Sequence, residues 1–430
     1  MRSSTILFVI FVIVLLVAVN IDIGLESLFT EEDYHYYSQD DSYNDYNDSF
    51  EIEDDYHPVF PQEEIDPDEN YVNVVNTIYE DDEFETNSEY SQYFYYKSLT
   101  DKQRDIYEKI VAGCVNYEST IKLNNNNQND VYLAQSAVSY DHPEFYWLNS
   151  FVITTRLNNV VSISFEVPND AQDRIERAND RVSAIISSSG TTDVERVKYF
   201  YDWIIDNTEY GDNKNSQDMT SVFIDGVSVC AGYSKAFLYL CQKAGIECIY
   251  VPGFTKNNIS HAWNLIKLNN NYYWVDTTWG DPVFADLKDN ITNYNYFLVS
   301  DSDFLRNHVI DSNVRLQDGT LIPLNVYFPP CIDDSLNYYN VNGCYFKDFN
   351  KQGIDNYLLY KLNNGKFNNI EFKFSTEHDY KLFLSEYFEG EDAYIFSVIR
   401  KSRSFYYSAI SINYSMLDSA YYVSLNVSKE

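Results

Sequence analysis

The sequence predicts an α+β fold, in which helices lead into an antiparallel sheet and a mostly β region follows. Two capping boxes, which begin at Thr100 and Thr192, each precede apolar residues at helical spacing. Two apolar segments, 260–268 and 272–276, flank a run of asparagines that is typical of a hairpin turn. Apolar and aromatic residues then alternate with polar ones in much of 321–429, as they do in strands.

The other elements are predicted from spacing and from turn residues. The expected order is a helix over 100–113, strands over 131–140 and 151–167 with a turn at 141–147, helices over 175–185 and 192–205, a helix from Cys230 to Ala244, and a strand over 247–254. Gly245 follows the helix that starts at Cys230, and glycine favours such helix ends. After residue 316, the clearest strands are 370–374 and 421–427.

The chain is longer than a typical single domain, since it has 430 residues. We divide it into a signal peptide or N-terminal membrane anchor (1–24), an acidic disordered linker (25–96), an N-terminal α+β region (97–190), a central domain that carries the candidate chemistry (191–315) and a C-terminal β-rich domain (316–430).

Charge is strongly negative and unevenly distributed. There are 66 Asp and Glu against 30 Lys and Arg, a formal net charge of −36. Acidic residues crowd the segment from Asp22 to Glu89, and no Lys or Arg occurs from Ser3 to Tyr96. Such a segment has too little apolar surface to offset chain entropy, so we expect disorder. The charge also argues against nucleic acids and anionic membrane surfaces as partners.

The N-terminus predicts export. An apolar run from Ile6 to Val19 follows Arg2, which is the length of a signal peptide and short for a full membrane span. A cleaved signal peptide and an uncleaved anchor both fit this pattern. We therefore expect a protein that is secreted or anchored on the extracellular side of a membrane.

The candidate nucleophile is Cys230, at the amino end of its predicted helix. Unpaired backbone N–H groups and the positive end of the helix dipole favour a thiolate there, and the same N–H groups can stabilise an oxyanion. The six cysteines lack the paired spacing of a zinc site or of a disulfide scaffold. We expect no metal and no cofactor.

The candidate base lies on the predicted hairpin. If Asn269 and Asn270 form a two-residue turn, Asp276 lies across from Trp263, on the same face as His261 and diagonal to it. A carboxylate there can orient the imidazole, and a thiolate beside that imidazole completes an arrangement suited to acyl transfer.

Three blocks carry a family resemblance. They are Val229-Cys230-Ala231-Gly232-Tyr233, His261-Ala262-Trp263-Asn264 and Val275-Asp276-Thr277-Thr278-Trp279. In order and spacing they resemble the motifs of the transglutaminase-like superfamily. The resemblance implies a papain-like α+β domain with an antiparallel sheet and with Cys230, His261 and Asp276 as its catalytic triad.

The resemblance implies acyl transfer or hydrolysis on peptide or glutamine amides through a thioester, in the manner of a cysteine protease, an amidase or an acyltransferase. An inactive scaffold that binds a surface partner is the alternative. The expected partner is a protein or peptide, including cell-surface or cell-wall peptides. We expect Trp263, Trp279 and Tyr233 near the substrate, and His142 and His308 to be structural.

Overall fold

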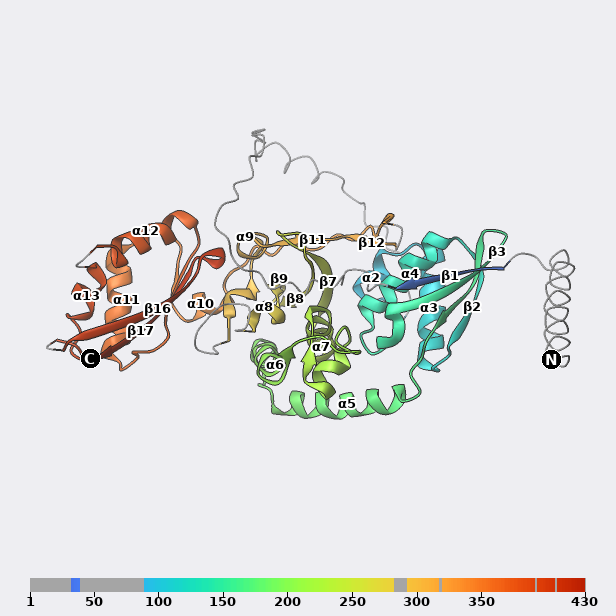
Figure 1. Ribbon diagram of the computed structural model, residues 1–430, viewed down its shortest axis with the longest axis horizontal. Coiled ribbons are helices and arrows are strands. Elements are labelled where there is room, and N and C mark those ends of the chain that lie inside the picture. Colours follow the sequence, from blue (N-terminus) through green and yellow to red (C-terminus); the bar gives the residue numbers. More distant parts are fainter. Residues whose placement is uncertain are drawn as a thin grey trace, which may run out of the picture.

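The computed structural model describes residues 32–38, 89–281, 292–316, 319–390, 393–406 and 408–429. The apolar run 6–19 and most of the acidic segment lie outside these ranges, so the expectations for them stay predictions. Within the described ranges, no helix combines the length and apolar character needed to cross a membrane. The N-terminal part, a central part and a C-terminal part follow one another along the long axis of the molecule (Figure 1).

The N-terminal part packs helices against one four-stranded sheet. Its elements are β1 (Glu32–Ser38), α2 (Phe94–Ser98), α3 (Asp101–Val115), β2 (Thr120–Asn126), α4 (Gln128–Asp141), η1 (Tyr146–Asn149), β3 (Ser150–Arg156) and β4 (Asn159–Phe165). The sheet order is β1-β3-β4-β2. Helix α3 begins where the sequence predicts, because the side chains of Thr100 and Gln103 form the expected capping box.

Two predictions for this part are wrong. Residues 131–140, expected as a strand, belong to helix α4, which Asn127 caps by accepting a hydrogen bond from the Asn129 N–H group. This helix is buried almost all round, so its apolar residues show no helical stripe. The linker expected to be disordered is ordered in two places: residues 32–38 form the edge strand β1 antiparallel to β3, and residues 94–96 belong to helix α2, in which Tyr95 and Tyr96 are buried. The sequence of 32–38 is rich in tyrosine, which favours strands.

The central part holds a five-stranded antiparallel sheet in the order β10-β9-β8-β7-β11. The strands are β7 (Cys248–Thr255), β8 (Ser260–Leu268), β9 (Asn271–Val275), β10 (Phe297–Val299) and β11 (His308–Ile310). The α-helices are α5 (Ala171–Ser188), α6 (Asp193–Asn207), α7 (Cys230–Lys243), α8 (Thr277–Gly280) and α9 (Asp301–Phe304), and a short π-helix, η2 (Ser221–Asp225), and a short 3-10 helix, η4 (Tyr294–Tyr296), complete it. Short strands β5 (Glu209–Tyr210) and β6 (Val227–Ser228) pair before α7, and β12 (Asn313–Arg315) and β13 (Leu321–Pro323) pair after β11.

The central sheet is buried on both faces. Trp263, Leu265 and Trp274 belong to a core shared with the N-terminal part, whereas Ile266 and Tyr273 belong to a core shared with α6 and α7. Burying both faces fixes the register of β8 and β9, because a slip by one residue would exchange the two faces.

The C-terminal part has its own core and a four-stranded sheet, β14-β15-β17-β16. Its elements are α10 (Tyr338–Val341), β14 (Tyr345–Phe346), α11 (Lys351–Asn363), β15 (Ile370–Phe374), α12 (Glu377–Phe388), α13 (Tyr394–Ile399), β16 (Ile410–Leu417), η5 (Asp418–Ala420) and β17 (Tyr422–Lys429). Strand β15 has the predicted bounds. The mostly β description needs correction, because helices α11, α12 and α13 cover the sheet (Figure 1). Ile354, Leu358 and Leu362 form an apolar stripe at helical spacing in α11. The alternating apolar and polar residues in the rest of this region led the sequence analysis to miss it.

The turn between β8 and β9 offers a stability test. Asn269 and Asn270 have φ of 51° and 66°, as both central residues of a type I′ turn require. We expect Asn270→Gly to raise the free energy of unfolding by about 0.5–1 kcal/mol, because glycine accepts this backbone without strain. Asn270→Val should lower it by about 1–2 kcal/mol. Urea unfolding followed by tryptophan fluorescence measures both, and equal midpoints for the two variants would contradict the turn assignment.

Candidate active site

Cys230 is the first residue of α7, where the chain enters the helix from the short strand β6. The N-cap residue is Val229, whose side chain makes no capping hydrogen bond. The N–H groups of the first turn therefore point away from the helix without a side-chain cap. They are available to a negative charge that forms next to the Cys230 sulfur.

Gly232 allows the start of α7 to lie close to the preceding loop. A Cβ atom at this position would lie 2.0 Å from the Ser228 Oγ atom and 2.6 Å from the Ser216 carbonyl oxygen. Ser216 also accepts a hydrogen bond from the Val229 N–H group at 3.1 Å. The glycine of the first sequence block is thus a packing requirement that sets the position of Cys230.

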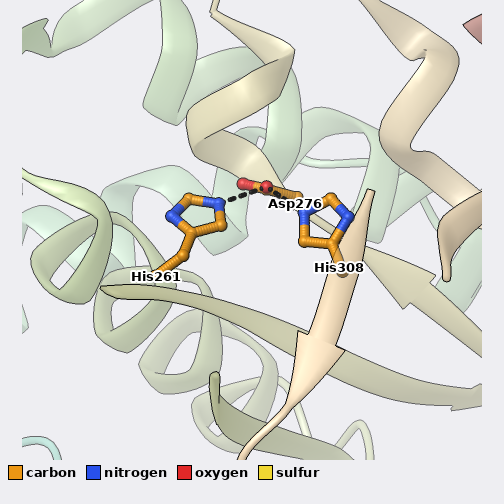
Figure 2. Close-up of side chains that lie close together, drawn as sticks. All are labelled: His261, Asp276 and His308. Carbon is orange, nitrogen blue, oxygen red and sulfur yellow. Dashed lines mark hydrogen bonds and ion pairs between the residues drawn. The ribbon is translucent and has the colours of Figure 1, made fainter. Parts of the chain in front are cut away.

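The hairpin brings His261 and Asp276 together as predicted. Asn264 pairs with Val275 and Leu268 with Asn271, so the register carried forward by one residue sets Asp276 opposite Trp263. The Nε2 atom of His261 lies 2.6 Å from Oδ2 of Asp276. Figure 2 shows the carboxylate between the rings of His261 and His308.

Asp276 also starts the short helix α8, which holds its carboxylate in place. Its Oδ1 atom accepts hydrogen bonds from the N–H groups of Thr278 and Trp279, at 2.9 and 3.1 Å. Oδ1 is therefore used by the backbone, and Oδ2 is directed at the histidines. The side chain is fully buried, with 0% relative exposure, so water does not compete for either oxygen.

Burial and charge give His261 and Asp276 opposite pKa shifts. Burial lowers the pKa of His261, but the Asp276 carboxylate and the neighbouring Cys230 thiol outweigh it and raise the pKa to about 10. Burial raises the pKa of Asp276, yet the charge and hydrogen bond of His261 and those of His308 leave it well below its usual range. At neutral pH the pair is an imidazolium and a carboxylate.

His308 is a site residue that the sequence reasoning treated only as structural. It is buried at the start of β11, and its Nε2 atom lies 3.1 Å from Oδ2 of Asp276, while Nδ1 lies 3.2 Å from the carbonyl oxygen of Phe304. Burial leaves the pKa of His308 lowered, despite the nearby carboxylate. No sequence block marks this residue, because the pairing of β11 with β7 brings it to the site.

A pocket of about 530 Å³ opens beside His261. Trp279 lines it and stacks on His261, with ring centroids 5.4 Å apart. Trp263 is fully buried behind the histidines, 4.8 Å from the ring of His308, and forms a wall of the site. Trp279 is thus the tryptophan placed to meet a substrate.

Tyr233 does not reach this pocket. It is fully buried, and its hydroxyl group lies 2.9 Å from the Thr208 carbonyl oxygen and 3.1 Å from the Asp281 carboxylate. The expectation that Tyr233 contacts substrate is therefore corrected, since the side chain holds the first turns of α7 against the core.

His261, Asp276 and His308 are also, in the described part of the chain, the group whose ligand atoms could hold a metal ion, since these atoms lie within 4.8 Å of one another. Each facing atom already takes part in a hydrogen bond. A metal ion would have to replace those hydrogen bonds in a buried site. The geometry therefore fits two histidines that share one carboxylate better than it fits a metal site.

Comparison with known proteins matches part of the chain to a family. Residues 180–278 match the model of the transglutaminase-like superfamily. The kyphoscoliosis peptidases of Homo sapiens and Mus musculus are 28% and 29% identical over 153 and 154 residues, which is 31% of this chain and 23% of each relative. The chain therefore spans under a quarter of the length of these relatives. A crystal structure of a TGase aligns with a TM-score of 0.22 and 15% identity, over 30% of this chain and 44% of that one.

The first site prediction concerns the charge of His261. Replacing Asp276 with asparagine removes the carboxylate that contributes most to raising the pKa of His261, so this pKa should fall from about 10, because burial is then opposed by Cys230 alone. Titration of the histidine ring by NMR measures the change. A His261 pKa that stays the same in Asp276→Asn would contradict the assigned pair.

The second site prediction concerns the hydrogen bond of His308. Loss of its hydrogen bond in His308→Leu leaves the Asp276 charge to His261 alone, so the pKa of His261 should rise and the alkylation of Cys230 should persist to higher pH in its imidazolium-paired form. His308→Gln keeps a donor and should return both readouts close to those of the unchanged protein. Both readouts unchanged in His308→Leu would show that His308 serves packing only.

Proposed function

Because residues 180–278 carry a transglutaminase-like domain, we propose that this protein is a thiol enzyme that acts on peptide or glutamine amides through a Cys230 thioester. The observation that carries the proposal is the buried hydrogen bond from His261 to Asp276, at 2.6 Å, with Cys230 at the amino end of α7 beside that histidine. Nucleophile, base and orienting carboxylate are thus on three elements that pack together.

The two ring nitrogens of His261 have separate tasks in this mechanism. Nε2 is bound to Asp276, which leaves Nδ1 to exchange a proton with the Cys230 sulfur. The resulting thiolate attacks the amide carbon, and the carbonyl oxygen takes up the electron pair as an oxyanion. The N–H groups of the first turn of α7 stabilise that charge.

His261 then acts as the acid. As the tetrahedral intermediate collapses, the carbon–nitrogen bond breaks and Nδ1 gives its proton to the departing amine, leaving the acyl group on sulfur. A water molecule or a second amine attacks the thioester and returns its proton to His261. Asp276 keeps its charge throughout and stabilises the imidazolium.

Hydrolysis and amine transfer share every step up to the thioester, so both belong to the proposal. The substrate is a protein or peptide, and with export it would be a cell-surface or extracellular one. The alternative is a protein with this architecture that catalyses no reaction and serves as a binding scaffold. In that case the Cys230 thiol would be no more reactive than a free thiol.

The proposal is tested with the full chain and iodoacetamide across pH, followed by mass spectrometry of all six cysteines. We expect selective alkylation of Cys230 below neutral pH, abolished in His261→Ala, since the thiolate needs the imidazolium beside it. Cys114 is fully buried, and burial raises the pKa of its thiol to about 12, so it is an internal control that should stay unlabelled.

A second measurement separates the chemistries. Incubation of a glutamine peptide with a labelled primary amine should give free acid for a hydrolase or a labelled amide for a transferase, and neither product in Cys230→Ala. Alkylation of Cys230 no faster than that of a free thiol, with no product in either assay, would overturn the enzyme proposal and leave the scaffold.

A further inference from the structure

The pocket beside His261 has a wall that comes from the C-terminal part of the chain. Leu417 and Ser419, at the turn between β16 and β17, line it together with Trp279 and with Lys256 from the turn between β7 and β8. Resting on the function proposed above, we propose that this pocket is a substrate subsite that takes a carboxylate-bearing group, and that the C-terminal part supplies its specificity wall.

Two consecutive residues hold that wall against the central domain. The guanidinium group of Arg306 donates to the carbonyl oxygen of Ser375 at 2.8 Å and lies 4.3 Å from the ring centroid of Tyr421. The side-chain amide of Asn307 donates to the carbonyl oxygen of Ser419 at 3.2 Å.

The same segment reaches the catalytic carboxylate. Asn307 also donates to the Tyr296 hydroxyl group at 3.1 Å, and the next residue, His308, contacts Asp276. The wall is therefore attached to Arg306 and Asn307, which directly precede His308, and His308 contacts Asp276. This attachment sets the distance between the wall and His261. A C-terminal part that served only as a spacer would not line this pocket.

The charge of the pocket differs from that of the chain. Its described lining contains no Asp or Glu and includes Lys256 and the His261 imidazolium, on a chain whose net charge is −36. Asp418 lies between the two wall residues, but its carboxylate binds the hydroxyl group of Tyr380. In the described part of the chain Lys256 belongs to no ion pair, so its charge is free to meet a ligand.

The remaining lining fits the backbone and stem of such a group. It includes hydroxyl and amide side chains together with the apolar residues Trp279, Ile259 and Leu417. A volume of about 530 Å³ lies within the range of small-ligand pockets. An acidic side chain would meet Lys256, whereas the ammonium group of a lysine would be repelled by it.

The test uses three probes with one reactive group: the N-chloroacetyl derivatives of aspartate amide, asparagine amide and lysine amide. Each is reacted with the full chain, and the second-order rate of alkylation at Cys230 is measured by mass spectrometry. The aspartate probe should react about two- to fivefold faster than the asparagine probe, and the lysine probe should be slowest. Lys256→Gln should abolish that order and Lys256→Glu should reverse it.

Two matched controls isolate the causes. Lys366→Gln makes the same change in net charge at an exposed site in the C-terminal part and should leave the order unchanged. Ser419→Phe fills the pocket from its wall and should slow all three probes by at least about fivefold, whereas Ser419→Ala should not.

Alkylation by iodoacetamide, which is too small to need the pocket, separates the two proposals. If iodoacetamide shows an activated Cys230 but the three probes react equally, or their order persists in Lys256→Glu, the subsite is wrong and the proposed function stands. If Ser419→Phe leaves every rate unchanged, the C-terminal wall plays no part. If iodoacetamide shows no activated thiol, the proposed function itself fails.

Discussion

The carboxylate of Asp276 is the group on which the site depends. It is a fully buried anion whose Oδ1 atom accepts hydrogen bonds from two backbone N–H groups of α8, while its Oδ2 atom lies 2.6 Å from Nε2 of His261 and 3.1 Å from Nε2 of His308. Removing one partner of such a buried ionic pair costs about 3–5 kcal/mol, because an uncompensated charge is left in the interior. The sheet, the short helix and β11 must therefore be assembled together for this carboxylate to exist as an anion.

That requirement explains why the elements around the site are so closely packed. Register between β8 and β9 is fixed by burial of both sheet faces, and it sets Asp276 on the face of His261. The Asp276 side chain then begins α8, so one residue both ends the hairpin and starts a helix. A local change in either element would move the carboxylate relative to the imidazole.

The segment from Arg306 to His308 links this carboxylate to the C-terminal part. Arg306 and Asn307 contact residues of that part, and His308 contacts Asp276. The C-terminal part has a separate core, yet its turn between β16 and β17 lines the pocket of the central domain. The fold of the C-terminal part and the shape of the pocket beside His261 are thus linked through the three adjacent residues Arg306 to His308. In the proposed subsite, this link lets the arrangement of the two parts affect which substrate fits.

Sequence by itself determined the elements whose signals are local. Capping boxes at Thr100 and Thr192, the start of α7 at Cys230 and the turn at Asn269 follow from side chains and backbone preferences within a few residues, and the hairpin geometry of His261 and Asp276 follows from counting along that turn. Only the tertiary structure decided that 131–140 is a helix, because burial on all sides erases a periodic signal. It alone decided the roles of His308 and of the C-terminal wall, since strands and turns far apart in the sequence meet there and no local pattern records such a contact.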